Sequence, residues 1–311
     1  MGSSRDTAWR LFPVIGPAIF AIFCGEALAI GPDNYGYTAT ATTFAFEDLT
    51  EPGITATGIL DFGNDVAVAI PIGFPFTFYG KTYTSLYVSS NGLITFGNAD
   101  VDPVPVDLTT SGPQNNLPSI AVLWHDWTFQ YLGSDEAYYA TLGPAGNRRL
   151  IVQWNFAISF TGRGSDTVTF EAKLFEGSNN IEFHYYDATV ETDPKVSNGK
   201  NATVGIRDTG GQTSTRNLQW SSNQAVISDG LAIQFAAPVF EIWSIQHLGN
   251  GHTLLQCVGE PNVANTIQVS TDLINFNFLA SVVADSLGNF PYEDMNAGSL
   301  PPRRFYRLSL Q

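Results

Sequence analysis

Alternating apolar and polar residues fill the stretch FPFTFYGKTYTSLYVSSNGLITFG, which runs from position 74 to position 97. Successive side chains of a strand point to opposite faces, so Phe74, Phe76 and Phe78 share one face. We expect that face to lie in a core. Residues 83–89 alternate again, and the Asn91–Gly92 dipeptide predicts a hairpin with a type I′ turn, in which both residues take a positive φ. The stretch therefore predicts three short antiparallel strands, with no catalytic motif among them.

The same pattern recurs along the chain. Short strand-like runs such as SIAVLW, RRLIVQWNFAIS and NIEFHYYD are separated by clusters of Gly, Asn, Asp and Ser, which favour tight turns. Beyond the N-terminal apolar segment, we find no run in which apolar residues repeat with helical spacing. Ten or more strands at this spacing predict an all-β fold, an antiparallel β-sandwich.

The N-terminus has the three parts of a secretory signal peptide. Two Arg residues precede a short apolar run, and the small-residue sequence ALA ends at Ala29. We therefore expect residues 1–29 to be removed and the protein to be secreted. A membrane anchor is disfavoured, because the run is shorter than the ~20 apolar residues of a spanning helix and contains Pro13 and Pro17.

Composition limits the partners of the mature chain. Its single cysteine, Cys257, excludes an internal disulfide, so packing must stabilise the fold. Only 14% of the residues are charged, against about 25% in an average domain, which is typical of extracellular β-proteins. The net charge of −15 and the scarcity of Lys argue against nucleic acid, because phosphate recognition relies on basic clusters. We expect no membrane insertion after signal removal.

A domain boundary is expected at the sequence AAPVF, residues 236–240, where Pro238 follows the end of one strand pattern. This predicts a large domain over residues 30–238 and a small one over residues 239–311. A domain that small without a disulfide buries little apolar area. We expect it to lean on the larger domain or on a partner.

The pieces that carry a family resemblance lie, in order, between positions 58 and 235: IPIGFPFTFYGKTY, VSSNGLITFG, LPSIAVLWHDW, NRRLIVQWNF, VTFEAKLFEGSNNIEFHYYD, ATVGIRD and GLAIQF. Together they resemble a nidogen-like (NIDO-type) domain of secreted bacterial proteins. Residues 239–311, with IQVSTDLINFNFLASVVADSLGNFPYED and PPRRFYRL, are similar to a small C-terminal β-sandwich module of the fibronectin/immunoglobulin type. The resemblance implies extracellular or cell-surface adhesion and scaffolding, and it brings no catalytic residues.

Acidic residues on one loop are weak candidates for a calcium site. Asp100, Asp102 and Asp107 offer the hard oxygen ligands that calcium prefers. EF-hand spacing is absent, and Pro103 and Pro105 stiffen the loop. The pattern therefore favours a solvated acidic loop over a calcium site. We consider no cofactor other than calcium.

Aromatic residues crowd the stretch around Trp124-His125-Asp126-Trp127, where the nidogen-like family has a Trp followed by a run of acidic residues. The single carboxylate here weakens a metal-binding role, and His125 is interpreted as structural. Residues three apart on a strand face opposite sides, so we expect Trp124 in the core and Trp127 at the rim. Trp127, Asp126 and Tyr131 are the candidates for ligand binding.

Catalysis has little support. The chain lacks the sequence motifs of α/β-hydrolases, zinc proteases, P-loop enzymes and thiol redox enzymes. Glu171 and Glu182 lie on strands that we expect to be adjacent. Their carboxyl groups could therefore lie within the ~5–10 Å that separates the catalytic pair of a glycosidase. Their alternation with apolar residues instead favours the solvated face of a hairpin. We expect no enzyme.

Three functions stay open, in this order of preference. The first is a non-catalytic adhesion or scaffold protein of a bacterial cell surface or extracellular matrix. The second is a carbohydrate-binding module of an extracellular assembly, because exposed aromatics on a β-sandwich stack on sugar rings. The third is an accessory domain of a secreted hydrolase. The partner in the first two is an extracellular protein or a glycan.

Signal cleavage is directly testable. We expect secreted protein to begin at Ile30, because ALA is the best small-residue site after the apolar run. N-terminal sequencing of secreted material measures this start. A first residue more than a few positions away, or an intact Met1, contradicts the assignment.

Overall fold

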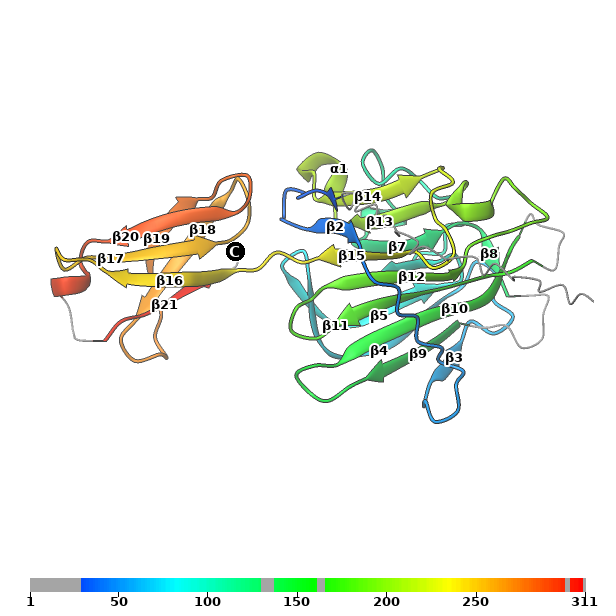
Figure 1. Ribbon diagram of the computed structural model, residues 1–311, viewed down its shortest axis with the longest axis horizontal. Helices are drawn as coiled ribbons and strands as arrows, with labels where there is room; N and C mark the ends of the chain where they lie inside the picture. Colours follow the sequence, from blue (N-terminus) through cyan, green and yellow to red (C-terminus); the bar gives the residue numbers. More distant parts are fainter. Residues whose placement is uncertain (1–28, 130–136, 161–165, 300–302, 310–311) are drawn as a thin grey trace, which may run out of the picture.

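The computed structural model describes residues 29–129, 137–160, 166–299 and 303–309. It shows two β-sandwiches side by side, joined by one connection (Figure 1). All the strand pairs of the described chain are antiparallel, which confirms the predicted all-β class. In the same residues the helical segments are single turns, namely η1 (Gln114–Asn116), η2 (Ser197–Gly199), α1 (Gly211–Ser214) and η3 (Ala297–Ser299), and no helix is long and apolar enough to cross a membrane.

Two sheets form the first sandwich. The larger has nine strands, in the order β1 (Ala29–Ile30), β2 (Thr38–Ala41), β15 (Ala232–Ala236), β12 (Ile181–Asp187), β11 (Val168–Phe175), β10 (Arg149–Ser159), β9 (Ala137–Leu142) and β3 (Thr57–Ile59), with β8 (Trp127–Thr128) beside β10. The smaller has the order β14 (Asn217–Ser222), β13 (Thr203–Arg207), β7 (Ser119–Trp124), β6 (Leu93–Thr95), β5 (Lys81–Ser89) and β4 (Ala67–Phe78).

Strand β4 supplies one side of the main core. Its residues alternate between buried and exposed from Ile70 to Phe78, and Phe74, Phe76 and Phe78 are all buried, as predicted. The rings of Phe76 and Phe78 pack on Phe96, with 4.9 Å between the ring centroids of Phe78 and Phe96, while the guanidinium of Arg148 lies 5.6 Å from the ring centroid of Phe74. The period of two in the sequence is therefore the period of burial.

The Asn91–Gly92 turn differs from the type I′ hairpin expected above. Gly92 has a φ of 72°, but Asn91 is not among the residues with a positive φ. The β5–β6 pairing ends at Val88 and Ile94, so the connection is longer than two residues. Asn91 is fully buried, because segments from elsewhere in the chain cover the turn.

A separate small sandwich follows. One sheet has the order β16 (Glu241–His247), β17 (Thr253–Val258) and β20 (Asn289–Asp294), and the other has the order β19 (Asn277–Val283), β18 (Ala264–Ser270) and β21 (Phe305–Ser309). Its buried core is small and consists of Leu255, Cys257, Ile267, Ala284 and Phe290. The thiol of Cys257 is a buried apolar group, and burial raises its pKa to about 11.

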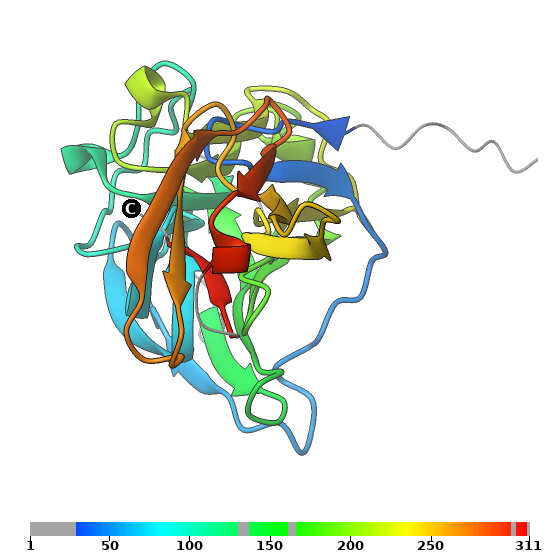
Figure 2. The ribbon, with the colours of Figure 1, turned by 90° about the vertical axis from the view of Figure 1, so that its left-hand side faces the viewer.

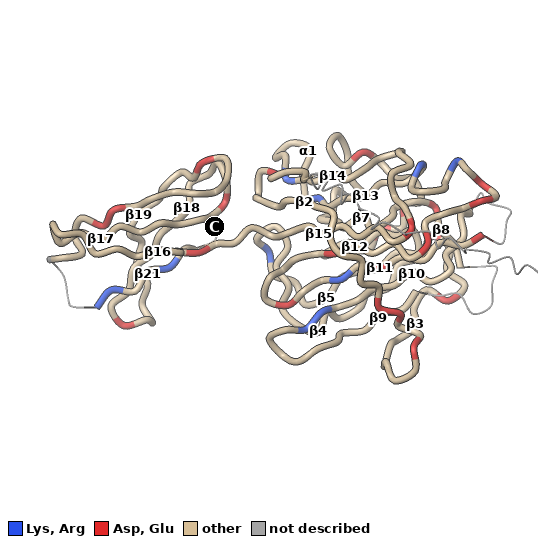
Figure 3. The backbone as a smooth tube through the Cα atoms, in the orientation of Figure 1, with Lys and Arg blue, Asp and Glu red and all other residues tan. Residues whose placement is uncertain are grey.

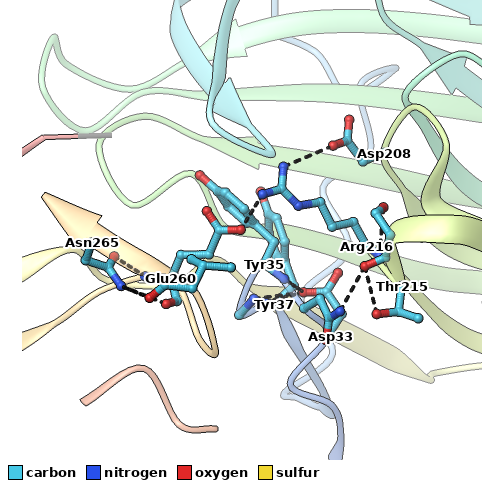
Figure 4. Close-up of polar contacts among 12 residues, drawn as sticks. Asp33, Tyr35, Tyr37, Asp208, Thr215, Arg216, Glu260 and Asn265 are labelled. Carbon is cyan, nitrogen blue, oxygen red and sulfur yellow. Dashed lines mark hydrogen bonds and ion pairs between the residues drawn. The ribbon is translucent and has the colours of Figure 1, made fainter. Parts of the chain in front are cut away.

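The small sandwich contacts the large one, as its size led us to expect. Viewed from that end, it lies in front of the first sandwich (Figure 2). Arg216, just before β14, forms ion pairs with Asp208 of the first sandwich and Glu260 of the second (Figure 4). Its guanidinium lies 5.3 Å from the ring centroid of Tyr35, and that ring packs on Phe240. An ion pair and an aromatic contact thus connect the two sandwiches.

Melting temperatures test the assignment of residues 74–97 to the core. Phe76→Ala is expected to cost about 3–5 kcal/mol, because the ring is fully buried. Gly92→Val is expected to be severe as well, since an added Cβ would lie 2.4 Å from the backbone oxygen of Leu123 at a φ of 72°. Asp102→Ala serves as the mild comparison. A Phe76→Ala variant that melts like the wild type but loses binding would overturn the core assignment.

Candidate functional site

The corner around Trp124 and Trp127 is not a binding shelf. Trp124 is buried as predicted, but Trp127 is also fully buried, so its expected place at the rim is wrong. The two rings do lie in different clusters. Trp127 belongs to the main core, while Trp124 packs with Leu93 and Leu108 in a small cluster on the other side of the sheet. Both faces are covered here, because the loop before Leu108 crosses the outer one, where Asp102 O accepts a hydrogen bond from Trp124 Nε1 at 2.8 Å.

Asn91 organises this corner. Its Oδ1 accepts a hydrogen bond from Trp127 N at 3.2 Å, and its Nδ2 donates to Asp65 Oδ1 at 2.9 Å and to Val101 O at 3.0 Å. Asp126 is partly buried nearby. Burial, and then the charge of Asp65, raise its pKa to about 6. Tyr131, the third predicted ligand-binding residue, lies outside the described residues.

The acidic loop uses its carboxylates to hold its own backbone. Asp100, Asp102 and Asp107 each accept a hydrogen bond from the backbone N–H two residues further on, at 2.8, 2.9 and 2.8 Å. Asp100 is 2% exposed and burial raises its pKa, so the expectation of a solvated loop is wrong for this residue. Over the described ranges, no group of three or more His, Cys, Asp and Glu side chains is placed to hold a metal ion.

His125 has a structural role. Its Nδ1 donates to the carbonyl of Asn201 at 2.9 Å, and its Nε2 then accepts a hydrogen bond from the hydroxyl of Ser159 at 3.0 Å. The geometry is that of a serine–histidine pair. Both side chains are nonetheless buried, at 3% exposure for His125 and 2% for Ser159, and burial lowers the pKa of the histidine. A substrate has no direct access to this pair.

The outer face of the nine-stranded sheet is crossed by an extended segment, residues 42–50, which we call the strap (Figure 1). Every second backbone N–H of the strap points to the sheet. Those of Ala45, Glu47 and Leu49 donate to side chains on three successive strands: His184 Nδ1 at 3.3 Å, Glu171 Oε1 at 3.1 Å and Gln153 Oε1 at 3.0 Å. The strap thus lies across β12, β11 and β10 and is held by their side chains.

Charged groups close the strap onto the sheet. Glu47 forms ion pairs with Arg149 and with Lys173, the latter at 2.8 Å. Burial raises the pKa of Glu47, but hydrogen bonds from Arg149 and Lys173 outweigh it and lower the pKa to about 2. Lys173 also lies 3.2 Å from Glu171. Beneath the strap, burial raises the pKa of Glu171 to about 8 despite the attraction of Lys173.

The prediction that Glu171 lies on a solvated face is therefore wrong. Its side chain does point outward, but the strap covers it and leaves it 0% exposed. Glu182 is engaged as well, through His184 Nε2 at 3.2 Å and Gln234 Nε2 at 2.9 Å. In the β11–β12 register Glu171 faces His184 and Glu182 faces Lys173, so the two carboxylates are not opposed as a pair.

Next to the side chains that the strap covers, aromatic residues reach the surface. Phe44 and Phe46 of the strap stack with 6.4 Å between ring centroids, and Phe46 lies 5.1 Å from the ring of Tyr186. Phe44 is 36% exposed and Tyr186 is 61% exposed. We call these three residues the aromatic strip.

An open hollow of about 560 Å³ adjoins the strip at Tyr186. The described residues that form its walls carry carboxylates and hydroxyls and include no basic side chain; they are Asp166, Thr167, Tyr186, Asp187, Thr189, Glu191 and Asp229. Burial, and then the neighbouring Asp229, Asp166 and Glu191 charges, raise the pKa of Asp187. We call this the acidic hollow. It offers hydrogen-bond acceptors beside an exposed ring.

Sequence reasoning missed this surface, although one part of it carried a signal. In the run HYYD, Tyr185 donates its hydroxyl to Val122 O at 2.7 Å inside the core, so the next residue, Tyr186, has to face outward. Phe44 and Phe46 carried no comparable signal, because the strap forms no strand.

Comparison with known families supports this description of the fold. The family model described as NIDO related matches residues 36–237, which is most of the chain, and the chain therefore belongs to this family. A nidogen-like domain is thus present, and it coincides with the first sandwich. Comparisons with curated proteins and with solved structures find no match.

The covered glutamate predicts a pH dependence. The pKa of Glu171 rises from 4.5 to about 8 on folding, so between these values the native state binds more protons and stability falls as pH rises. Glu171→Gln keeps an oxygen acceptor for Glu47 N and removes the charge. We expect the melting temperature of the variant, relative to wild type, to increase between pH 5 and about pH 8.5.

Glu176→Gln is the matched control, directly after β11. A hydrogen bond from Arg148 lowers the pKa of Glu176 to about 2, so both the carboxylate and its arginine partner stay charged over that whole range. Its melting-temperature difference from wild type should therefore be constant. A constant difference for Glu171→Gln too would show that Glu171 is ionised throughout and contradict the account.

Proposed function

We propose that the protein is a non-catalytic, extracellular binding protein of the cell surface or matrix, with the nidogen-like domain as its recognition unit. The observation that carries this proposal is the aromatic strip beside the acidic hollow. Exposed aromatic rings next to hydrogen-bonding groups are characteristic of recognition surfaces. The polar residues that sequence analysis weighed for chemistry are engaged in holding loops and the strap.

The second candidate function names the ligand: we propose that the binding surface recognises a glycan. Sugar rings stack their C–H faces on aromatic side chains, and carboxylates accept hydrogen bonds from sugar hydroxyls. Tyr186 provides an accessible ring, while Asp187, Thr189 and Asp229 line the hollow next to it. Both versions of the proposal use the same surface, so one set of variants tests both.

Binding to an array of extracellular glycans, and to surface and matrix extracts, tests the proposal with Tyr186→Ala and Phe46→Ala. We expect each variant to lose about 2 kcal/mol of binding free energy, about thirtyfold in affinity, with little change in melting temperature. Phe278→Ala is the matched control, since this aromatic residue is 67% exposed on the small sandwich. Equal binding by wild type and both strip variants would refute a role for the strip.

A further inference from the structure

The small sandwich contains a cavity of about 770 Å³ at the end far from the nidogen-like domain. It lies where the end of β16, the start of β17, η3 and the start of β21 come together (Figure 1). Its size falls in the range of small-molecule sites. Ile245, Leu248 and Phe305 supply apolar walls.

The polar lining is basic, in a chain with a net charge of −15. All three basic residues of the small sandwich belong to β21 or the residues just before it (Figure 3), and two of them, Arg303 and Arg304, line the cavity. His247 and His252 also line it. Two acidic side chains form ion pairs with this lining: Glu293 binds His252 Nδ1 at 2.7 Å and Asp294 binds Arg304 Nη1 at 2.7 Å.

Arg304 is held in place by buried groups. Its side chain is 10% exposed, and its partner Asp294 is 1% exposed and also accepts a hydrogen bond from the hydroxyl of Tyr306 at 2.9 Å. A guanidinium has five N–H donors, and Asp294 is the one ion-pair partner of Arg304 in the described chain. The Arg304 guanidinium is therefore held in place by Asp294 and still has N–H donors for a ligand.

Arg303 is exposed and has no carboxylate within ion-pair distance among the residues that the structure describes. His247 Nδ1 forms a hydrogen bond with Thr253 Oγ1 at 3.1 Å, and no described residue bonds its Nε2. The cavity therefore combines an immobilised guanidinium, an unpaired guanidinium and an imidazole with an apolar wall. A guanidinium fork matches the geometry of a carboxylate or a phosphate, and beside an apolar wall the singly charged carboxylate loses less hydration energy on binding.

We propose that this cavity binds a carboxylate-bearing sugar of the uronic acid class. The carboxylate would bind Arg303 and Arg304, the ring hydroxyls would bind His247, and the C–H face would pack on Phe305 and Ile245. The site lies on a different domain from the aromatic strip and does not depend on it.

Calorimetric titration of the full-length protein with sodium glucuronate tests this site, with methyl glucoside as the neutral sugar and sodium hexanoate as the carboxylate without a sugar. We expect saturable binding of glucuronate that weakens with added salt, and weak or absent binding of the other two. Arg303→Gln should reduce glucuronate affinity about tenfold or more, because a charge-assisted hydrogen bond is lost.

Arg307→Gln is the matched control. This arginine lies on the same strand, but its guanidinium packs over Phe276 at 4.1 Å and its Nε binds Gln268, and it does not line the cavity. Its affinity for glucuronate should equal that of the wild type, as should that of Tyr186→Ala. The proposal is overturned if glucuronate does not bind, if hexanoate binds as tightly, or if both arginine variants lose affinity equally.

Discussion

The hydrogen bonds between the strap and the outer face of the nine-stranded sheet determine what this domain presents to its surroundings. Ala45, Glu47 and Leu49 direct their N–H groups inward, one residue in two, onto side chains of β12, β11 and β10. Glu47 adds ion pairs to Arg149 and Lys173. Alternate side chains of an extended segment lie on one side of it, so Phe44 and Phe46 lie together. Their rings pack along β12, against His184 and Tyr186 respectively, and with Tyr186 they form the aromatic strip.

The corner around Asn91 is also held by bonds between side chains and the backbone of distant segments. Unlike the strap, this corner leaves neither of its two Trp rings exposed to solvent. Asn91 binds Asp65, Val101 and Trp127, and Trp124 binds Asp102. Polar groups in such a buried network must be satisfied internally, and a ligand would have to displace those bonds. Composition alone would have favoured this corner, with its two Trp residues, as the site.

The sequence correctly predicts which face of a strand each side chain points to. It does not predict which outward-facing side chains are buried by other segments of the chain. Alternation placed Phe74, Phe76 and Phe78 in the core and Glu171 on the outer side of its strand, and both directions are right. The predicted exposure is wrong for Glu171, Trp127 and Asp100. The strap covers Glu171, Trp127 packs into the main core from β8, and Asp100 is buried in its own loop. The strap and the loop before Leu108 carry no periodic pattern, so what they cover is decided by tertiary contacts. The aromatic strip was missed for the same reason.

Hydrogen exchange of the full-length protein, with and without bound extracellular glycan or matrix material, tests most directly where the nidogen-like domain makes its contacts. Recognition through the aromatic strip and the acidic hollow predicts that binding slows exchange in residues 42–48 and 184–191, while residues 98–107 and 124–128 stay unchanged. Protection confined to residues 98–107 and 124–128 would place recognition at the Asn91 corner and contradict the account.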